Sequence, residues 1–154
     1  MKVPFLKLKE HNLNYKSDFK IAFEKFIESG DYILGKEVEE FEKNFSNYIG
    51  SRFAVGVSNC HDGLELLLKS VGVGIGDEII VPSNTFLATW LAVLNMGAIP
   101  VPVEPQIENY NIDPQKLEFA ITKKTKAIIV AHLYGLPCDM DAINKIAIKH
   151  SIYV

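Results

Sequence analysis

The chain has 154 residues, of which 48% are hydrophobic and 23% are charged, and its net charge is −3. This size and composition are typical of one soluble globular domain with a substantial core. The small negative charge gives no broad basic surface, so nucleic acid is excluded as an expected partner. No apolar run is long enough to span a bilayer and the N-terminus lacks a signal-peptide core, so no membrane partner is expected.

The two cysteines indicate neither a metal site nor a disulfide framework. Cys60 and Cys138 are far apart in the sequence and form no ligand pair with a histidine, which argues against zinc. We therefore expect no metal, and cysteine usage of this kind favours a reducing cytoplasm.

The first third of the chain is expected to be helical. Apolar residues at a spacing of three or four predict one helix from Ser17 to about Ser29 and a second that contains Val38 and ends at Gly50. We expect residues 1–50 to form an N-terminal helical segment ahead of an α/β domain at 51–154.

The stretch around Ser58 and Asn59 is the part of the sequence most suggestive of a ligand. An apolar strand is predicted from Phe53 to Val57, and a helix is predicted to begin near Cys60. A strand that enters a helix through a short polar turn leaves backbone N–H groups free to bind an anion. The alternative is that Ser58 or Asn59 only caps the helix.

Beyond this turn, strands and helices alternate. The glycine-rich run 72–77 closes a helix and precedes a strand, which is the reverse of a dinucleotide fingerprint, so it is interpreted as a helix cap and turn. Strands are predicted at 78–81, 99–103, 127–131 and from 152, with helices over 87–94, after Asp113-Pro114 and over 140–150. The alternation predicts an α/β fold, a three-layer sandwich around a mostly parallel sheet.

The last predicted strand, 152–154, stops as soon as it begins. Natural chain ends usually lie at the surface and not inside a buried strand. We therefore expect the sequence to be the N-terminal part of a longer enzyme or a truncated product.

Five segments together resemble the DegT/DnrJ/EryC1/StrS family of sugar aminotransferases, which have the type I fold of enzymes that use pyridoxal 5′-phosphate (PLP). The similarity covers nearly the whole chain, in order, and is carried by residues 35–42, 55–64, 76–89, 110–114 and 132–141. It implies that residues 51–154 are an incomplete PLP-binding large domain.

The resemblance also assigns cofactor-binding residues. The phosphate would accept hydrogen bonds from the backbone of Cys60, His61 and Asp62, and Phe86 would stack on the pyridine ring. Without the resemblance, Phe86 would be interpreted as a core-facing aromatic. Cys60-His61 stands where the family has Gly-Thr, so a threonine hydroxyl is missing, and the imidazole could itself donate a hydrogen bond to phosphate.

No catalytic residue is assigned within the chain. In the family, the aspartate that pairs with the ring nitrogen and the Schiff-base lysine both fall beyond the position of Val154. Lys123, Lys124 and Lys126 lie on a link between a helix and a strand and are interpreted as solvated.

The resemblance implies a PLP-dependent aminotransferase of nucleotide-linked keto sugars in amino-sugar and polysaccharide biosynthesis. The expected substrate is a dTDP-3-keto-6-deoxyhexose, the expected amino donor is glutamate, and the full-length form is expected to be a homodimer. The alternative is a non-catalytic remnant, or a phosphate-binding module without the Schiff-base lysine.

Overall fold

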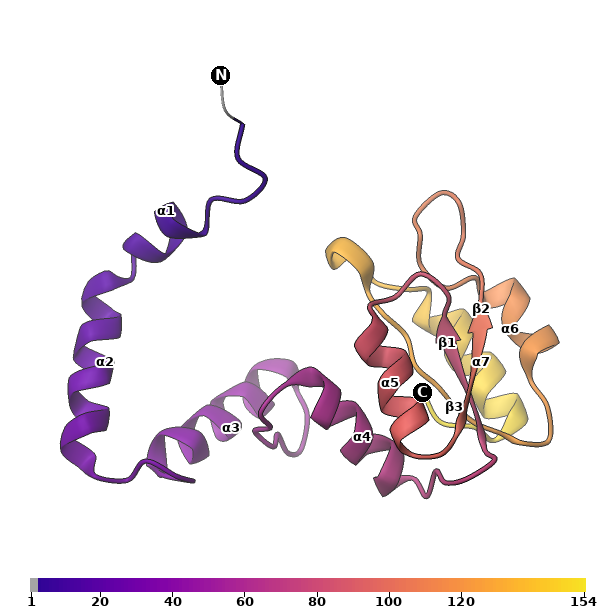
Figure 1. Ribbon diagram of the computed structural model, residues 1–154, viewed down its shortest axis with the longest axis horizontal. Coiled ribbons are helices and arrows are strands. Elements are labelled where there is room, and N and C mark those ends of the chain that lie inside the picture. The colour runs from indigo at the N-terminus through magenta and orange to yellow at the C-terminus, as the bar shows by residue number, and fades with distance from the viewer. Residues whose placement is uncertain (1–2) are drawn as a thin grey trace. The chain divides into compact units, whose positions relative to one another are not determined.

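The computed structural model describes residues 3–154, and the chain divides after Gly56 into two compact units. The first unit, indigo to violet in Figure 1, contains α1 (Leu8–Leu13), α2 (Lys16–Ser29) and α3 (Lys36–Ile49). The second unit contains the remaining elements: α4 (Cys60–Ser70), β1 (Glu78–Pro82), α5 (Leu87–Asn95), β2 (Ile99–Val103), α6 (Pro114–Ala120), β3 (Thr125–Ile128), the 3-10 turn η1 (Leu133–Gly135) and α7 (Met140–His150).

The two helices expected in the N-terminal segment are present as α2 and α3. Each ends at a glycine in the left-handed region, Gly30 with φ 73° and Gly50 with φ 72°. Side chains with a Cβ rarely adopt this conformation, so glycine is suited to end both helices. Along α1 and α2 no residue is buried, and large apolar side chains such as Phe19 and Phe23 are exposed.

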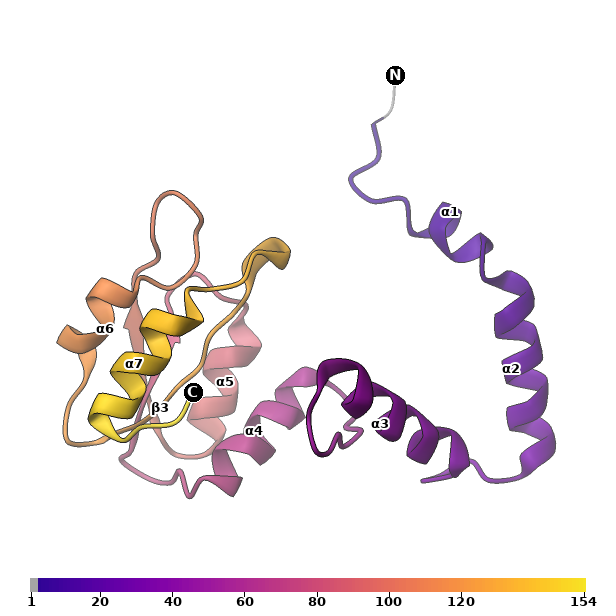
Figure 2. The same cartoon turned by 180° about the vertical axis from the view of Figure 1, so that it is seen from behind.

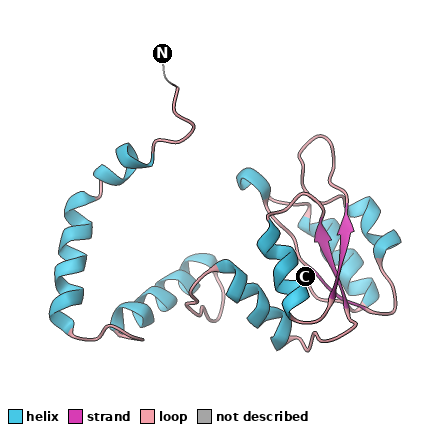
Figure 3. Cartoon of the chain, viewed as in Figure 1, coloured by secondary structure: helices cyan, strands magenta, loops and turns pink. Residues whose placement is uncertain are grey.

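The second unit is built on a parallel sheet of order β2-β1-β3, as predicted. The central strand β1 pairs in parallel with both neighbours, and two of these strands are seen as adjacent magenta arrows in Figure 3. Ile79, Ile80 and Val81 on β1 have no exposed surface at all. A central strand of a parallel sheet is covered on both faces, which is why these three consecutive residues are all apolar.

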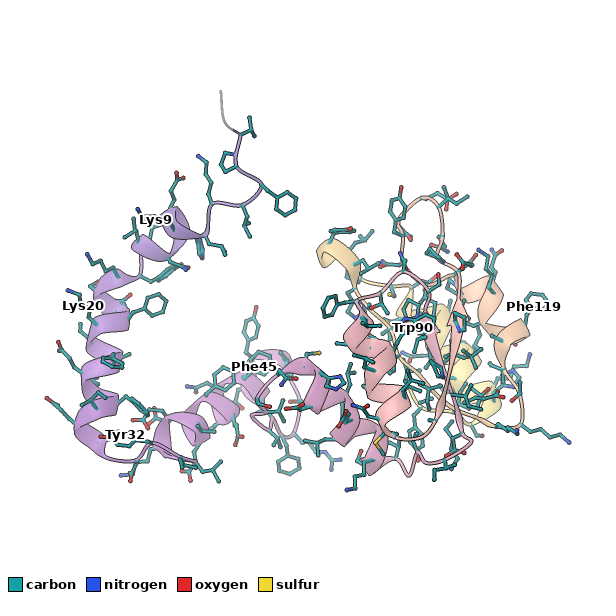
Figure 4. The ribbon with its side chains drawn as sticks, in the orientation of Figure 1. Lys9, Lys20, Tyr32, Phe45, Trp90 and Phe119 are labelled. Carbon is teal, nitrogen blue, oxygen red and sulfur yellow. The ribbon has the colours of Figure 1, made fainter. Side chains whose placement is uncertain are left out.

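Helices cover both faces of the sheet and give the predicted three layers. Ile79 and Val81 pack in a cluster with residues of α4 and α5, whereas Ile80 packs in a second cluster with residues of α6 and α7. The helix α7 lies behind the sheet in Figure 1 and in front of it in Figure 2. Trp90 on α5, labelled in Figure 4, packs against the first cluster.

Prolines define the outer edge of β2. The N–H of Ile99 donates to Asp77 O over 2.8 Å, so residues 99, 101 and 103 face β1 and the backbone of Pro100 and Pro102 faces the other way. Proline has no N–H, so this side of β2 lacks the donors that another strand would need.

Three strand predictions need correction. Residues 53–57 were expected to form a strand, but they are irregular, and the side chains of Phe53 and Val55 are largely exposed. Strand structure requires a hydrogen-bonded neighbour, and within residues 3–154 no segment pairs with this one. The strand predicted from residue 127 begins at Thr125 and ends at Ile128, and the last one is a single parallel bridge between Ala127 and Tyr153.

A buried amide holds together the loops that follow β2 and β3. Asn111 is 2% exposed, and its Nδ2 donates to Leu136 O over 2.9 Å and is 3.3 Å from Pro137 O. Its Oδ1 accepts from Leu133 N over 3.1 Å. These bonds fix the chain on either side of Tyr134, whose φ of 55° is unusual for a residue other than glycine.

We expect Asn111→Ala to lower the free energy of unfolding by about 2 kcal/mol, because it leaves a buried N–H and carbonyl groups without partners. Urea unfolding followed by circular dichroism measures this change. Asn144→Ala, at an exposed position on α7, is the matched control and should change stability by less than about 0.5 kcal/mol. Equal effects of the two substitutions would contradict the role given to Asn111.

A surface ion pair joins α6 to α7. Lys149 Nζ lies 2.7 Å from Glu118 Oε1, and His150 Nε2 lies 3.5 Å from the same oxygen. The hydrogen bond and charge of Lys149, with a further contribution from His150, lower the pKa of Glu118. Because the pKa is lower in the folded than in the unfolded chain, the pair stabilises the fold at neutral pH, and this contribution is lost as pH falls through the carboxyl range.

We expect a carboxyl ¹³C titration to show Glu118 with a lower pKa than is ordinary for glutamate. Lys149→Met should raise that pKa toward its ordinary value, since it removes the nearest positive charge. Lys145→Met on the same helix serves as the control and should leave the Glu118 titration unchanged. A Glu118 midpoint that does not respond to Lys149→Met would show that another group lowers it.

Candidate cofactor-binding site

The first turn of α4 is closed by a side-chain cap. Asn59 is the N-cap, with an extended backbone, and its Oδ1 accepts from the N–H of Asp62 over 3.0 Å. The Asp62 carboxylate accepts in return from Asn59 Nδ2 over 3.0 Å and from the hydroxyl of Ser58. Asn59 is thus an N-cap of the expected kind, and its side chain is held in turn by the carboxylate of Asp62.

The cap changes which backbone groups are free to bind an anion. The N–H of Asp62 is already used by Asn59, so the expectation that it donates to phosphate does not fit this conformation. The N–H groups of Cys60 and His61 make no hydrogen bond within residues 3–154. They stand at the positive end of an 11-residue helix, where free donors and the helix dipole favour an anion.

The side chain of His61 turns toward α5. Its Nδ1 lies 3.1 Å from the carbonyl oxygen of Ala88, and because a carbonyl can only accept, Nδ1 carries the hydrogen. Its Nε2 lies 3.0 Å from Glu65 Oε1, and Asn95 Nδ2 donates to that same oxygen over 2.5 Å. Asn95 Nδ2 also lies 3.3 Å from Nε2, so Nε2 accepts from Asn95 when the ring is neutral and donates to Glu65 when the ring is protonated. Both ring nitrogens therefore contact protein groups, and in this conformation neither is directed to a phosphate.

Phe86 stands at the start of α5, as its N-cap residue, and its side chain is 81% exposed. It is therefore not a core aromatic, and the face of its ring is open to a ligand. Ala88, two residues further on, contacts His61. The first turn of α5, which bears Phe86, is thus adjacent to the first turn of α4, which bears Cys60 and His61.

The other polar turns lie at the carboxyl ends of the parallel strands, where ligands of open α/β sheets bind. Asn84, after β1, donates from Nδ2 to Tyr110 O over 2.9 Å and so joins the loops after β1 and β2. The contacts of Asn84, Asn95 and Glu65 were not predicted from the sequence. The His61/Glu65 spacing of four residues on a helix was a readable signal, whereas nothing in the sequence points from His61 to Ala88 or Asn95.

The cysteines differ in environment, and neither is bonded to another cysteine. Cys60 is exposed at the start of α4, whereas Cys138 is buried, where its Sγ donates to Ala131 O over 3.2 Å. Burial raises the pKa of the Cys138 thiol. Within residues 3–154 no group of three or more His, Cys, Asp or Glu residues is placed to hold a metal ion, and no helix is long and apolar enough to cross a membrane.

Comparison with protein families settles the ancestry of this fold. The model of the DegT/DnrJ/EryC1/StrS aminotransferase family matches residues 14–154. The chain belongs to this family. Its family members include PLP-dependent aminotransferases that act on nucleotide sugars, and the fold expected from the resemblance is confirmed.

Individual relatives agree with this assignment. The chain is 49% identical over 152 residues to a dTDP-3-amino-3,6-dideoxy-alpha-D-galactopyranose transaminase of Aneurinibacillus thermoaerophilus. It is 44% identical over 153 residues to a dTDP-3-amino-3,4,6-trideoxy-alpha-D-glucose transaminase of Streptomyces venezuelae. These alignments cover 99% of this chain but 42% and 40% of the relatives. The chain thus spans about two-fifths of the length of these relatives.

Solved structures are similar to this chain over nearly its whole length. The structure of S. venezuelae DesV matches with a TM-score of 0.95 and 45% identity, over 98% of this chain and 41% of that one. NtdA of Bacillus subtilis, solved with bound cofactor PMP, matches with a TM-score of 0.94 and 36% identity, over 98% of this chain and 35% of that one.

The environments of the two thiols predict different reactivity toward Ellman's reagent. We expect one equivalent, Cys60, to react rapidly in the folded chain and the second, Cys138, to react only in denaturant, because its thiolate is disfavoured by burial. Cys60→Ser should abolish the rapid phase. If Cys138→Ser abolished it instead, the buried position of Cys138 would be wrong.

Proposed function

We propose that this chain is the cofactor-binding N-terminal part of a PLP-dependent aminotransferase that acts on a dTDP-linked 3-keto-6-deoxyhexose, with L-glutamate as amino donor. The observation that carries the proposal is the adjacency of two turns. One offers the free N–H groups of Cys60 and His61, and the other offers the exposed ring of Phe86.

The donor set fits a phosphorylated aromatic cofactor. A phosphate monoester carries close to two negative charges at neutral pH, and backbone N–H groups at a helix start bind such a group well. Cys60 and His61 would hold the phosphate through their backbones, Asp62 would keep the turn in shape through the Asn59 cap, and Phe86 would stack on the ring.

PLP, when bound, supplies an electron sink that makes amino-group transfer possible. The residues of this chain contribute binding and orientation: the α4 turn anchors one end of the cofactor, and Phe86 sets the plane of its ring. The carboxylate for the ring nitrogen and the lysine that moves the proton belong, in our proposal, to a longer polypeptide of which this chain is a part. We further propose that the complete protein is a homodimer and that residues 51–154 belong to its large domain.

The substrate class rests on the relatives. The two transaminases compared above are named for dTDP-linked amino sugars, and a relative from Pseudomonas aeruginosa, 41% identical over 152 residues, is named UDP-2-acetamido-2-deoxy-3-oxo-D-glucuronate aminotransferase. The higher identities favour a dTDP sugar and a role in amino-sugar or polysaccharide biosynthesis. The two free thiols agree with a reducing cytoplasm.

We expect the chain to bind pyridoxamine 5′-phosphate, which needs no lysine for attachment, and Phe86→Ala to weaken this binding roughly fivefold through loss of about 1 kcal/mol of stacking. Isothermal titration calorimetry measures both dissociation constants. Phe119→Ala is the matched control, because Phe119 is also largely exposed but projects from α6 (Figure 4). Equal affinities of the Phe86→Ala and Phe119→Ala variants would show that Phe86 does not stack on the cofactor.

The activity is tested on the complete product of the gene that encodes this chain. With PLP and L-glutamate alone we expect release of one equivalent of 2-oxoglutarate per site, and with a dTDP-3-keto-6-deoxyhexose we expect repeated turnover. Release of a keto acid from another amino acid, with no 2-oxoglutarate released from L-glutamate, would refute the assignment of L-glutamate as the donor. Turnover with a UDP-linked keto sugar but not with the dTDP sugar would refute the substrate.

A further inference from the structure

We propose that His61 is a positioning residue whose imidazole fixes the first turn of α5, and therefore Phe86, against the first turn of α4. The positioning itself is a property of this chain, and only its consequence for a cofactor rests on the function proposed above. Among the contacts of the site, it is the side-chain hydrogen bond that runs directly from the α4 turn to the α5 turn.

The contact acts close to Phe86. His61 Nδ1 donates to Ala88 O over 3.1 Å, and Ala88 is the second residue of α5, directly after the N-cap Phe86 and Leu87. A carbonyl oxygen has two lone pairs, so Ala88 O can accept from the imidazole and still serve the helix. A shift of this carbonyl would therefore carry Phe86 with it, because the intervening backbone is helical.

The imidazole is itself held in place from the opposite side. Nε2 lies 3.0 Å from Glu65 Oε1, one turn further along α4, and Asn95 at the end of α5 donates to the same oxygen over 2.5 Å. The side chains of His61 and Glu65 are 27% and 32% exposed. Asn95 Nδ2 also lies 3.3 Å from Nε2 and can donate to it when the ring is neutral. A ring with protein partners at both nitrogens, and partly shielded from water, has one orientation, as positioning requires.

The packing of α4 on α5 does not depend on this contact. Leu68 of α4 and Ala92 and Val93 of α5 lie together in the apolar cluster on that face of the sheet. These side chains hold the bodies of the two helices together, while His61 acts at their first turns. The loss of the imidazole should therefore displace Phe86 without unfolding the chain.

The substitution of His61 for the family's threonine then has a physical meaning. A threonine hydroxyl at the helix start can donate to phosphate directly. The imidazole is longer, and it reaches the carbonyl group of Ala88 on the next helix instead. The phosphate would then be bound by the backbone N–H groups of Cys60 and His61.

Three substitutions distinguish the roles of the two ring nitrogens of His61. His61→Asn keeps a donor near the Nδ1 position, His61→Gln keeps one near the Nε2 position, and His61→Leu removes both. In the wild-type chain, long-range ¹H–¹⁵N correlation should show a protonated Nδ1. We expect the Ala88 carbonyl and Phe86 ring resonances to stay near wild type in the Asn variant and to shift in the Gln and Leu variants.

Binding is measured on the same proteins with two probes. Pyridoxamine 5′-phosphate engages both turns, whereas inorganic phosphate engages the α4 turn alone. We expect the Gln and Leu variants to bind pyridoxamine 5′-phosphate roughly fivefold more weakly, the Asn variant to bind it like wild type, and inorganic phosphate to bind all four proteins equally. Urea unfolding of each variant confirms that it is folded.

An unprotonated Nδ1, unchanged Ala88 and Phe86 resonances in the Gln variant, or wild-type behaviour restored by Gln but not Asn would overturn the proposal. If His61→Leu does not fold, the comparison of Asn with Gln decides. If neither probe binds the wild-type chain, the proposed cofactor site is wrong. The resonances of Ala88 and Phe86 still test whether His61 positions the first turn of α5.

Discussion

The fold of the second unit depends on the complete burial of β1. Its residues Ile79, Ile80 and Val81 alternate between the two apolar clusters, so one strand provides the contact surface for helices on both faces. A strand with this role cannot change register without moving apolar side chains out of both clusters at once. The turn at its carboxyl end is therefore attached to a strand that is held by apolar contacts on both faces.

That constraint explains how an exposed side chain can be attached to a fixed framework. Phe86 is exposed, but α5 follows β1 after a short turn and is packed against it by Ala92 and Val93. The α4 turn is fixed by its own cap of Asn59 and Asp62. Binding groups on turns, supported by rigid elements beneath, are the usual arrangement in open parallel sheets.

Much of this could be predicted from local sequence. The bounds of β2 and α7, the cap at Asp113-Pro114 and the parallel sheet follow from periodicity, caps and the alternation of elements, because these signals lie within a few residues of one another. The strand at 53–57 was wrong because an apolar run reports on the side chains and not on whether a partner strand exists. The contact from His61 to Ala88 spans 27 residues, and no pattern of spacing encodes it. The cofactor-binding roles of Cys60, His61 and Phe86 came from resemblance and remain predictions.

The prolines of β2 affect whether another strand can pair with the outer edge of the sheet. An exposed sheet edge is a template on which another chain can add a strand, and proteins that leave such an edge open risk aggregation. At Pro100 and Pro102 the outer side of β2 has carbonyl groups but no N–H donors. A strand that paired there would therefore lack the hydrogen bonds that β2 should donate. The two prolines therefore disfavour pairing of a further strand along this side of β2. The sheet can then be extended in one direction, past β3, where Tyr153 already pairs.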